Sequence, residues 1–293
     1  MPVSDGFLVI DKPSGITSHD VVARIRKVFG TKRVGHAGTL DPMATGVLVL
    51  GINNGTKLLQ YITEGKKRYL ATIKLGFATV TDDKDGKVLT TAAISDIEKV
   101  SDAEIKSNLL KLIGIIMQRP SSVSAIKIDG KRAYDRVREG EVVELPAREV
   151  TIYSLEILEI SRAEGAIAIK IDVSCSAGTY IRAIARDLGD VLKVGGHLTE
   201  LRRSEVAPFS IEAAVSIESI SPADLLNVVD VAKRILPARV IDLSEKSELK
   251  FGRSISASEF SGIGIAIMGD NELCALIENK NSGAQPITVF VKE

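Results

Sequence analysis

Residues 35–50 read GHAGTLDPMATGVLVL, a glycine-rich turn followed directly by an uncharged apolar run. Three glycines within residues 35–46 predict a backbone that bends sharply or approaches another segment closely. Pro42 favours an extended conformation for Asp41, so its carboxylate is expected to project from a turn. The run Val47–Leu50 predicts a buried strand. On these residues alone, an acid before proline is more often a plain turn or a helix cap than a catalytic group.

Strands and helices follow one another on both sides of this turn. Phe7–Ile10 predicts a short strand, and Ser18 is expected to cap a helix that ends at Gly30. Further strands are predicted at 69–75, 142–145, 150–160 and 167–173. Strands outnumber helices and come in runs, which indicates an α+β fold with a mixed or antiparallel sheet.

Two more helices are predicted from their first residues. Ser101 and Glu104 have the spacing of a capping box, and Gly114 is expected to end that helix. Gly178-Thr179 leads into a second helix. Its buried side is predicted to consist of four apolar residues at helical spacing: Ile181, Ile184, Leu188 and Val191.

The length of 293 residues suits one large domain with an appendage, or two domains. Prolines and a change of charge place a boundary in 207–240, so we predict domains at 1–236 and 237–293. The second consists of short apolar runs separated by Gly, Asn and Ser. A piece of this size is marginally stable alone, and we expect it to pack on the main body.

The composition is that of an ordinary globular protein, with 45% apolar and 26% charged residues. No apolar run is long enough to span a membrane, and the N-terminus lacks the features of a signal peptide, so we expect a cytoplasmic location. Cys175 and Cys274 stand far apart, as do the three histidines. We therefore expect buried, inert thiols and no metal site.

The formal net charge is zero, but the charges are unevenly distributed along the chain. Residues 1–206 carry 30 Lys and Arg against 26 Asp and Glu, whereas residues 207–293 carry 8 against 12. Basic clusters at 24–33, 66–68 and 127–138 could form a phosphate-binding surface if they share a face. Solvated helix faces explain the same charges at least as well, so charge permits a nucleic-acid partner without identifying one.

Six further motifs accompany the segment 35–46 elsewhere in the chain. Together the seven motifs resemble the TruB type of pseudouridine synthase. They recur in the family's order over about residues 6–210 and are far more specific together than any one alone. Beside 35–46 they are 11–15 (DKPSG), 67–69 (KRY), 75–86, 120–134, 178–182 (GTYIR) and 201–203 (LRR). One departure is Val123, where many relatives carry an aromatic residue, so a stacking contact there is not expected.

This resemblance implies the fold and the activity. The fold would be a pseudouridine synthase catalytic domain followed by a small β-rich domain, with 237–293 resembling a reduced PUA-like domain. The activity would be isomerisation of uridine 55 in the T loop of tRNA to pseudouridine, after the base is flipped out of its stack. This chemistry needs no metal or cofactor, and the sequence lacks nucleotide-binding motifs. No obligate protein partner is expected.

The resemblance also implies roles for seven residues. Asp41 would attack the ribose or the uracil, or act as a base on the sugar, and Arg182 would pair with it and offset its desolvation. Tyr69 would stack on the flipped base and is a candidate for removing the C5 proton. The remaining four would contact substrate or support the loop: Tyr180 and Leu201 in the pocket, His36 against the extruded loop bases, and Lys12 behind the turn.

Two alternatives remain open from the sequence. One is a pseudouridine synthase that acts on another RNA, as the guide-RNA-dependent enzymes do. The acidic C-terminus without a basic tail favours a stand-alone tRNA enzyme. The other is a non-catalytic protein that binds or folds tRNA. Binding alone does not require Asp41, Tyr69 and Arg182 together, which favours catalysis.

Overall fold

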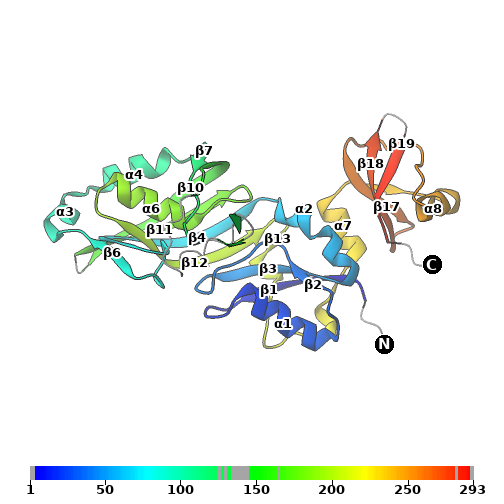
Figure 1. Ribbon diagram of the computed structural model, residues 1–293, viewed down its shortest axis with the longest axis horizontal. Coiled ribbons are helices and arrows are strands. Elements are labelled where there is room, and N and C mark those ends of the chain that lie inside the picture. The colour runs from blue at the N-terminus through cyan, green and yellow to red at the C-terminus, as the bar shows by residue number, and fades with distance from the viewer. Residues whose placement is uncertain are drawn as a thin grey trace.

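A mixed sheet of eleven strands carries most of the chain (Figure 1). The computed structural model describes residues 4–123, 127–128, 131–132, 145–163, 165–280 and 283–290. The long path through the sheet runs β14-β1-β3-β12-β4-β11-β10-β7. The strands are β1 (Gly6–Lys12), β2 (Val34–His36), β3 (Thr45–Ile52), β4 (Lys67–Leu75), β7 (Gly114–Gln118), β10 (Arg148–Ala163), β11 (Ala166–Cys175), β12 (Gly196–Val206), β13 (Phe209–Ser210), β14 (Val215–Ser216) and β15 (Leu226–Asn227).

Most pairs in this sheet are antiparallel, while β3 runs parallel to β12 and β1 to β14. The predicted α+β fold with a mixed sheet is therefore confirmed. The predicted strand at 142–145 lies almost entirely outside the described residues, as do the side chains of the basic cluster at 127–138. Two short hairpins stand apart from the sheet: β5 (Phe77–Thr79) with β6 (Val88–Thr91), and β8 (Lys127–Ile128) with β9 (Lys131–Arg132).

The helices cover the sheet and fill the main core. They are α1 (Ser18–Phe29), α2 (Leu59–Thr63), α3 (Ile94–Lys99), α4 (Asp102–Leu110), α6 (Ile181–Val191), α7 (Val228–Ile235) and α8 (Leu243–Lys250), with 3-10 turns η1 (Asn53–Leu58), η2 (Ile211–Ala213) and η3 (Pro222–Asp224). Buried side chains of α1, α4 and α6 share one core with alternate residues of β4 and β11. This core holds the ends of β4 and α6 in fixed positions.

The start of α1 differs from the prediction. Thr17, and not Ser18, caps the helix, since its side chain accepts from the Asp20 amide while the Asp20 carboxylate accepts from the Thr17 amide. Ser18 is used elsewhere, because its Oγ bonds both the amide (2.9 Å) and the carbonyl (3.1 Å) of Leu40. A serine that could serve as a cap thus fastens the glycine-rich loop to the helix. Gly30 ends α1 in the left-handed region, as predicted.

Two further predictions about helices are also corrected. The capping box of Ser101 and Glu104 is present, but α4 ends at Leu110 and Gly114 instead opens β7. Ile181, Ile184 and Leu188 of α6 are buried, whereas Val191 is 60% exposed. The helix ends at Val191, so the chain turns away there and Val194, 3% exposed, fills the core in its place.

The C-terminal part forms its own four-stranded sheet, set to one side of the large sheet (Figure 1). Its strands are β16 (Ala238–Val240), β17 (Ile263–Met268), β18 (Glu272–Lys280) and β19 (Gly283–Val289). Phe7 of β1, Val231 of α7 and Ile265 of β17 belong to one buried cluster, so this part packs on the main body as expected. The division at residue 236 stays a prediction.

The remaining expectations concern cysteines and membranes. Cys175 and Cys274 are both buried free thiols, and burial raises the pKa of Cys175 to about 11. Such a thiol is inert near neutral pH. Within the described ranges, no helix has both the length and the apolar character needed to cross a membrane.

Candidate active site

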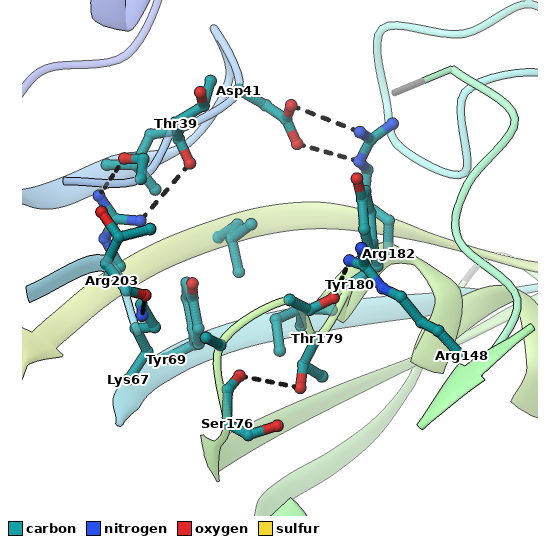
Figure 2. Close-up of a pocket in the computed structure, with 17 residues that line it drawn as sticks. Thr39, Asp41, Lys67, Tyr69, Arg148, Ser176, Thr179, Tyr180, Arg182 and Arg203 are labelled. Carbon is teal, nitrogen blue, oxygen red and sulfur yellow. Dashed lines mark hydrogen bonds and ion pairs between the residues drawn. The ribbon is translucent and has the colours of Figure 1, made fainter. Parts of the chain in front are cut away.

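A pocket of about 290 Å³ opens where the glycine-rich loop, the start of β4, the start of α6 and the middle of β12 meet (Figure 2). Five of the seven residues named from the sequence line it: Asp41, Tyr69, Tyr180, Arg182 and Leu201. They come from four segments that lie far apart in the chain. The fold therefore brings these predicted residues together in one cavity.

The loop that carries Asp41 is held from behind by the segment after β1. Gly15 donates its amide to the carbonyl of Pro42 at 2.8 Å. Lys12 is fully buried, and its ammonium donates to the carbonyls of Ile16 (2.7 Å) and Pro42 (3.3 Å). Together with the bonds between Ser18 and Leu40, these contacts fix the backbone on both sides of Asp41.

Asp41 forms a two-point ion pair with Arg182, which enters from the first turn of α6 (Figure 2). Arg182 Nε lies 3.0 Å from Asp41 Oδ2, and Nη2 lies 3.4 Å from Oδ1. The Asp41 side chain is 34% exposed while that of Arg182 is 6% exposed. The carboxylate therefore faces the pocket, and the arginine supports it from the protein side.

Arg182 is itself held by groups outside the pocket lining. Its Nη1 donates to the carbonyl of Thr81 at 2.6 Å, and Nη2 donates to that of Val123 at 3.0 Å. Asp83 Oδ2 lies 3.4 Å from Nη1, and this carboxylate is almost as buried as the arginine. Two carboxylates and two carbonyls thus fix the guanidinium, which cannot turn away from Asp41 without losing them.

Tyr69 closes the inner wall of the pocket. It is 9% exposed and pairs across the sheet with Arg203 of β12. Burial raises the pKa of the Tyr69 phenol, so this side chain is neutral near neutral pH. Arg203 is 2% exposed and donates to the carbonyls of Val47 (2.8 Å) and Gly38 (3.0 Å). One buried arginine therefore joins the wall behind Tyr69 to both ends of the glycine-rich loop.

Tyr180 is fixed through its backbone at the entrance to α6. Its amide donates to Gln118 Oε1 at 2.8 Å, and its carbonyl accepts from Gln118 Nε2 at 3.0 Å. The buried side-chain amide of Gln118 thus pairs with the Tyr180 backbone as a neighbouring strand would. It sets the position from which the aromatic ring lines the pocket.

Two protein-family models match this chain. The model of the TruB family pseudouridylate synthase N-terminal domain matches residues 26–181, and that of the tRNA pseudouridylate synthase B C-terminal domain matches 182–240. The chain belongs to the TruB family. Members of this family are isomerases that convert uridine to pseudouridine, so the chain is an enzyme of that class, as the sequence predicted.

Curated TruB relatives match over nearly the whole chain. The tRNA pseudouridine synthase B of Corynebacterium diphtheriae is 48% identical over 98% of this chain and 95% of its own length. That of Nocardia farcinica is 49% identical over 97% and 92%. The protein from Paenarthrobacter aurescens, with the same name, is 46% identical over 97% and 94%.

Solved structures support the TruB fold. An H/ACA RNP bound to a substrate RNA containing 2'-deoxyuridine contains a chain that matches with a TM-score of 0.71 at 23% identity, over 98% of this chain and 85% of that one. A Cbf5-Nop10-Gar1 complex gives 0.69 at 25%, over 98% and 84%. The first likeness is one of fold alone.

Two predicted residues of this TruB chain do not line the pocket. Lys12 lies behind the loop, as the expected support, and burial lowers its pKa to about 8. His36 lies on β2 with its ring 5.6 Å from that of His19, edge to face. Among the described residues its Nδ1 is buried without a hydrogen-bond partner, and burial lowers the pKa of His36. His36 therefore stands beside the loop of Asp41 and outside this cavity.

The sequence-based prediction missed four residues at this TruB site. Asp83, Gln118, Arg148 and Arg203 either line the pocket or bond to residues that do. Three of them lie in or next to recognised motifs, which could have suggested them. No pattern in the sequence indicates that Arg203 and Asp83 are buried, because a charge is buried only where tertiary contacts satisfy it.

Proposed function

We propose that this chain converts uridine 55 in the T loop of tRNA to pseudouridine. The observation that carries the proposal is the ion pair of Asp41 with Arg182, placed beside Tyr69 in one pocket. The three relatives described above are all named tRNA pseudouridine synthase B, which supports tRNA as the substrate. The cytoplasm, where such a substrate is found, stays the predicted location.

The reaction begins when the target base leaves its stack, which costs a few kcal/mol in general. Stacking on an aromatic ring returns about 1–3 kcal/mol, and Tyr69 offers such a ring on the inner wall. Leu201 and Tyr180 then confine the base. This arrangement explains why two aromatic side chains and a leucine surround one carboxylate.

Asp41 acts next, on the ribose C1′, on uracil C6, or as a base on the sugar. All three routes require an ionised, accessible carboxylate near the glycosidic bond. Arg182 holds the carboxylate at two points, and the partial exposure of Asp41 leaves it within reach of substrate. After the uracil is reattached through C5, a general base must remove the C5 proton. The Tyr69 side chain is our candidate for this step, acting as the phenolate, a form that the neighbouring Arg203 guanidinium favours against the effect of burial.

His36 and Lys12 act outside the pocket. His36 ends β2 directly before the loop of Asp41, and we assign it the role of contacting the bases next to the flipped uridine. Lys12 keeps the loop in place through backbone carbonyls and takes no part in the chemistry. The enzyme needs neither a metal nor a cofactor in this scheme, and no obligate protein partner.

Tritium release tests the proposal. The protein is incubated with an unmodified tRNA transcript labelled with tritium at uridine C5, because pseudouridine formation frees that hydrogen. Wild type should release tritium from a transcript with uridine at position 55 and lose this release when only position 55 is changed to cytidine. No release from wild type would overturn the enzymatic reading and favour a tRNA-binding protein. Release that survives the cytidine change would point to another site or RNA.

A second experiment tests the role of Asp41. Asp41→Asn should abolish release but retain tRNA binding in a gel-shift assay. Asp172→Asn is the matched control, because Asp172 makes a similar two-point pair with Arg68 at 2.8 Å for each contact, and neither residue lines the pocket. The control should turn over normally. Activity that survives in Asp41→Asn would remove Asp41 from the mechanism.

A further inference from the structure

Arg148 is a pocket cation to which the proposed reaction gives no role. It is the first residue of β10, and it reaches toward Tyr180 and the turn before α6 (Figure 2). Its guanidinium carbon lies 5.0 Å from the centroid of the Tyr180 ring, and its Nη2 donates to the carbonyl of Gly178. A Cβ on Gly178 would lie 3.3 Å from that nitrogen. Glycine at this position therefore leaves room for the guanidinium to approach the turn.

The other pocket cations already have acceptors on the protein. Arg182 pairs with Asp41, and Arg203 donates to the carbonyls of Val47 and Gly38. Lys67 donates to the carbonyls of Thr63 and Gly65, and burial lowers its pKa to about 8. Their positions follow from these protein contacts. These three side chains therefore serve as structural parts of the pocket.

Arg148 differs because, among the described residues, most of its donors have no protein acceptor. A guanidinium has five N–H donors. In the part of the chain that the structure describes, only the Gly178 carbonyl accepts from Arg148, no carboxylate pairs with it, and its Nε is buried without a partner. A buried donor without an acceptor costs free energy unless a ligand satisfies it. The side chain is thus arranged to accept an anion.

We propose that Arg148 binds a backbone phosphate of the RNA next to the flipped uridine. This inference rests on the proposed function and adds an anionic subsite to the same pocket. A nucleotide that enters the pocket brings phosphates on both sides of its ribose, and the half-buried Arg148 lies where the lining meets solvent. Phosphate oxygens match the planar fork of arginine in two-point contacts. The Tyr180 ring lies within cation–π distance of the guanidinium and helps to keep it at this place.

A single neutral linkage tests this contact. In the inactive Asp41→Asn background, T-stem-loop RNAs are compared that carry a methylphosphonate either 5′ or 3′ to the target uridine, or neither. One of the two should raise the Kd by about ten- to hundredfold, as expected for losing a charged hydrogen-bonded pair. The same linkage should matter less than about twofold once Arg148→Ala is added, because the partner is already gone.

Arg148→Gln separates phosphate binding from support of the turn. Its amide can still donate to the Gly178 carbonyl but carries no charge. We expect Arg148→Gln to bind as weakly as Arg148→Ala and to lower the slope of log Kd against log salt by about one ion. Arg162→Gln is the control, since Arg162 bonds Val100 and Asp102 away from the pocket. It should leave both quantities unchanged.

The outcomes separate this inference from the function on which it rests. If both methylphosphonates leave the Kd unchanged, or if their effects add to that of Arg148→Ala, the phosphate contact is wrong even though wild type still releases tritium. Wild-type binding by Arg148→Gln would show that the side chain only supports the turn. Failure of the function itself would appear earlier, as an absence of tritium release from wild type.

Discussion

Arg182 and Arg186 lie one turn apart on α6 and hold the same two segments of the chain. Arg182 bonds the carbonyls of Thr81 and Val123. Arg186 Nη1 lies 3.4 Å from Asp82 Oδ2, and its Nη2 donates to the carbonyl of Arg119 at 2.8 Å. Each arginine thus joins the loop near residue 82 to the segment near residue 120. Arg186 fixes the surroundings in which Arg182 meets Asp41.

Arg186→Ala should therefore slow the chemistry without weakening tRNA binding. Removal of Arg186 frees the segments that position Arg182, and misplacement by about 1 Å can cost about a hundredfold in rate. We expect the single-turnover rate of tritium release to fall about ten- to hundredfold, with the Kd for tRNA changed less than about threefold. The measurement is single-turnover release at saturating enzyme together with a binding titration.

A matched variant shows whether the effect is local. Arg162 also bridges distant parts of the chain, since it bonds Val100 O and Asp102 Oδ1 at the junction of α3 and α4 at 2.7 Å each, and none of these residues lines the pocket. Arg162→Ala should lower the melting temperature and leave the single-turnover rate of tritium release unchanged. If Arg186→Ala does the same, its role is stability alone and our interpretation is wrong.

Tyr69→Phe separates the ring of Tyr69 from its hydroxyl. The ring keeps its place in the core and its capacity to stack, so tRNA binding should change less than about threefold. Loss of a general base should lower the rate of tritium release by about 10²–10⁴. Tyr153→Phe, on an exposed tyrosine of β10, should behave as wild type. An unchanged rate in Tyr69→Phe would assign the C5 proton to another group.

Gly46→Ala should be among the most destabilising substitutions in the glycine-rich loop. Gly46 has a φ of 101°, and a Cβ there would lie 2.2 Å from the Arg203 carbonyl oxygen. Both strain and backbone clash oppose the change, which should cost about 3–5 kcal/mol of unfolding free energy. Gly15→Ala shares a positive φ but meets nothing within 4 Å, so it should cost only about 1–2 kcal/mol. Urea unfolding of both variants tests this, and equal losses would contradict it.

Local patterns in the sequence predicted the elements that carry the site. The period of two in 167–173 gave a strand, and the glycine-rich turn placed Asp41 outside a helix, because both depend on neighbours in the chain. Ser18 was misassigned for the opposite reason. Its hydroxyl satisfies Leu40, a residue 22 positions away, and no local rule reports such a contact.

Charged residues at the site were harder to predict than apolar ones. Family motifs drew attention to Asp41 and Arg182, but the physical support of the pair comes from Asp83, which is buried only after three segments meet. Arg203 was hard to predict for the same reason, since a buried arginine is tolerated only where carbonyl groups accept hydrogen bonds from it. Burial of charge is thus a tertiary property, and a single sequence gives little sign of it.

Lys12 gives the pocket a pH-dependent support that unfolding experiments can detect. Burial lowers its pKa from 10.5 to about 8, so between these values the unfolded chain keeps a proton that the native chain has lost. Stability rises with pH wherever the unfolded state binds more protons. The unfolding free energy of wild type should therefore increase relative to Lys12→Met from about pH 8 to pH 10, and the difference should be level below pH 7.

Urea titrations at pH 6, 7, 8, 9 and 10 measure this difference in unfolding free energy, and Lys67 contributes equally to both proteins. Lys106→Met, on the exposed side of α4, is the control and should give no such slope. A difference that is level across the whole range would show that Lys12 keeps its proton in the folded protein.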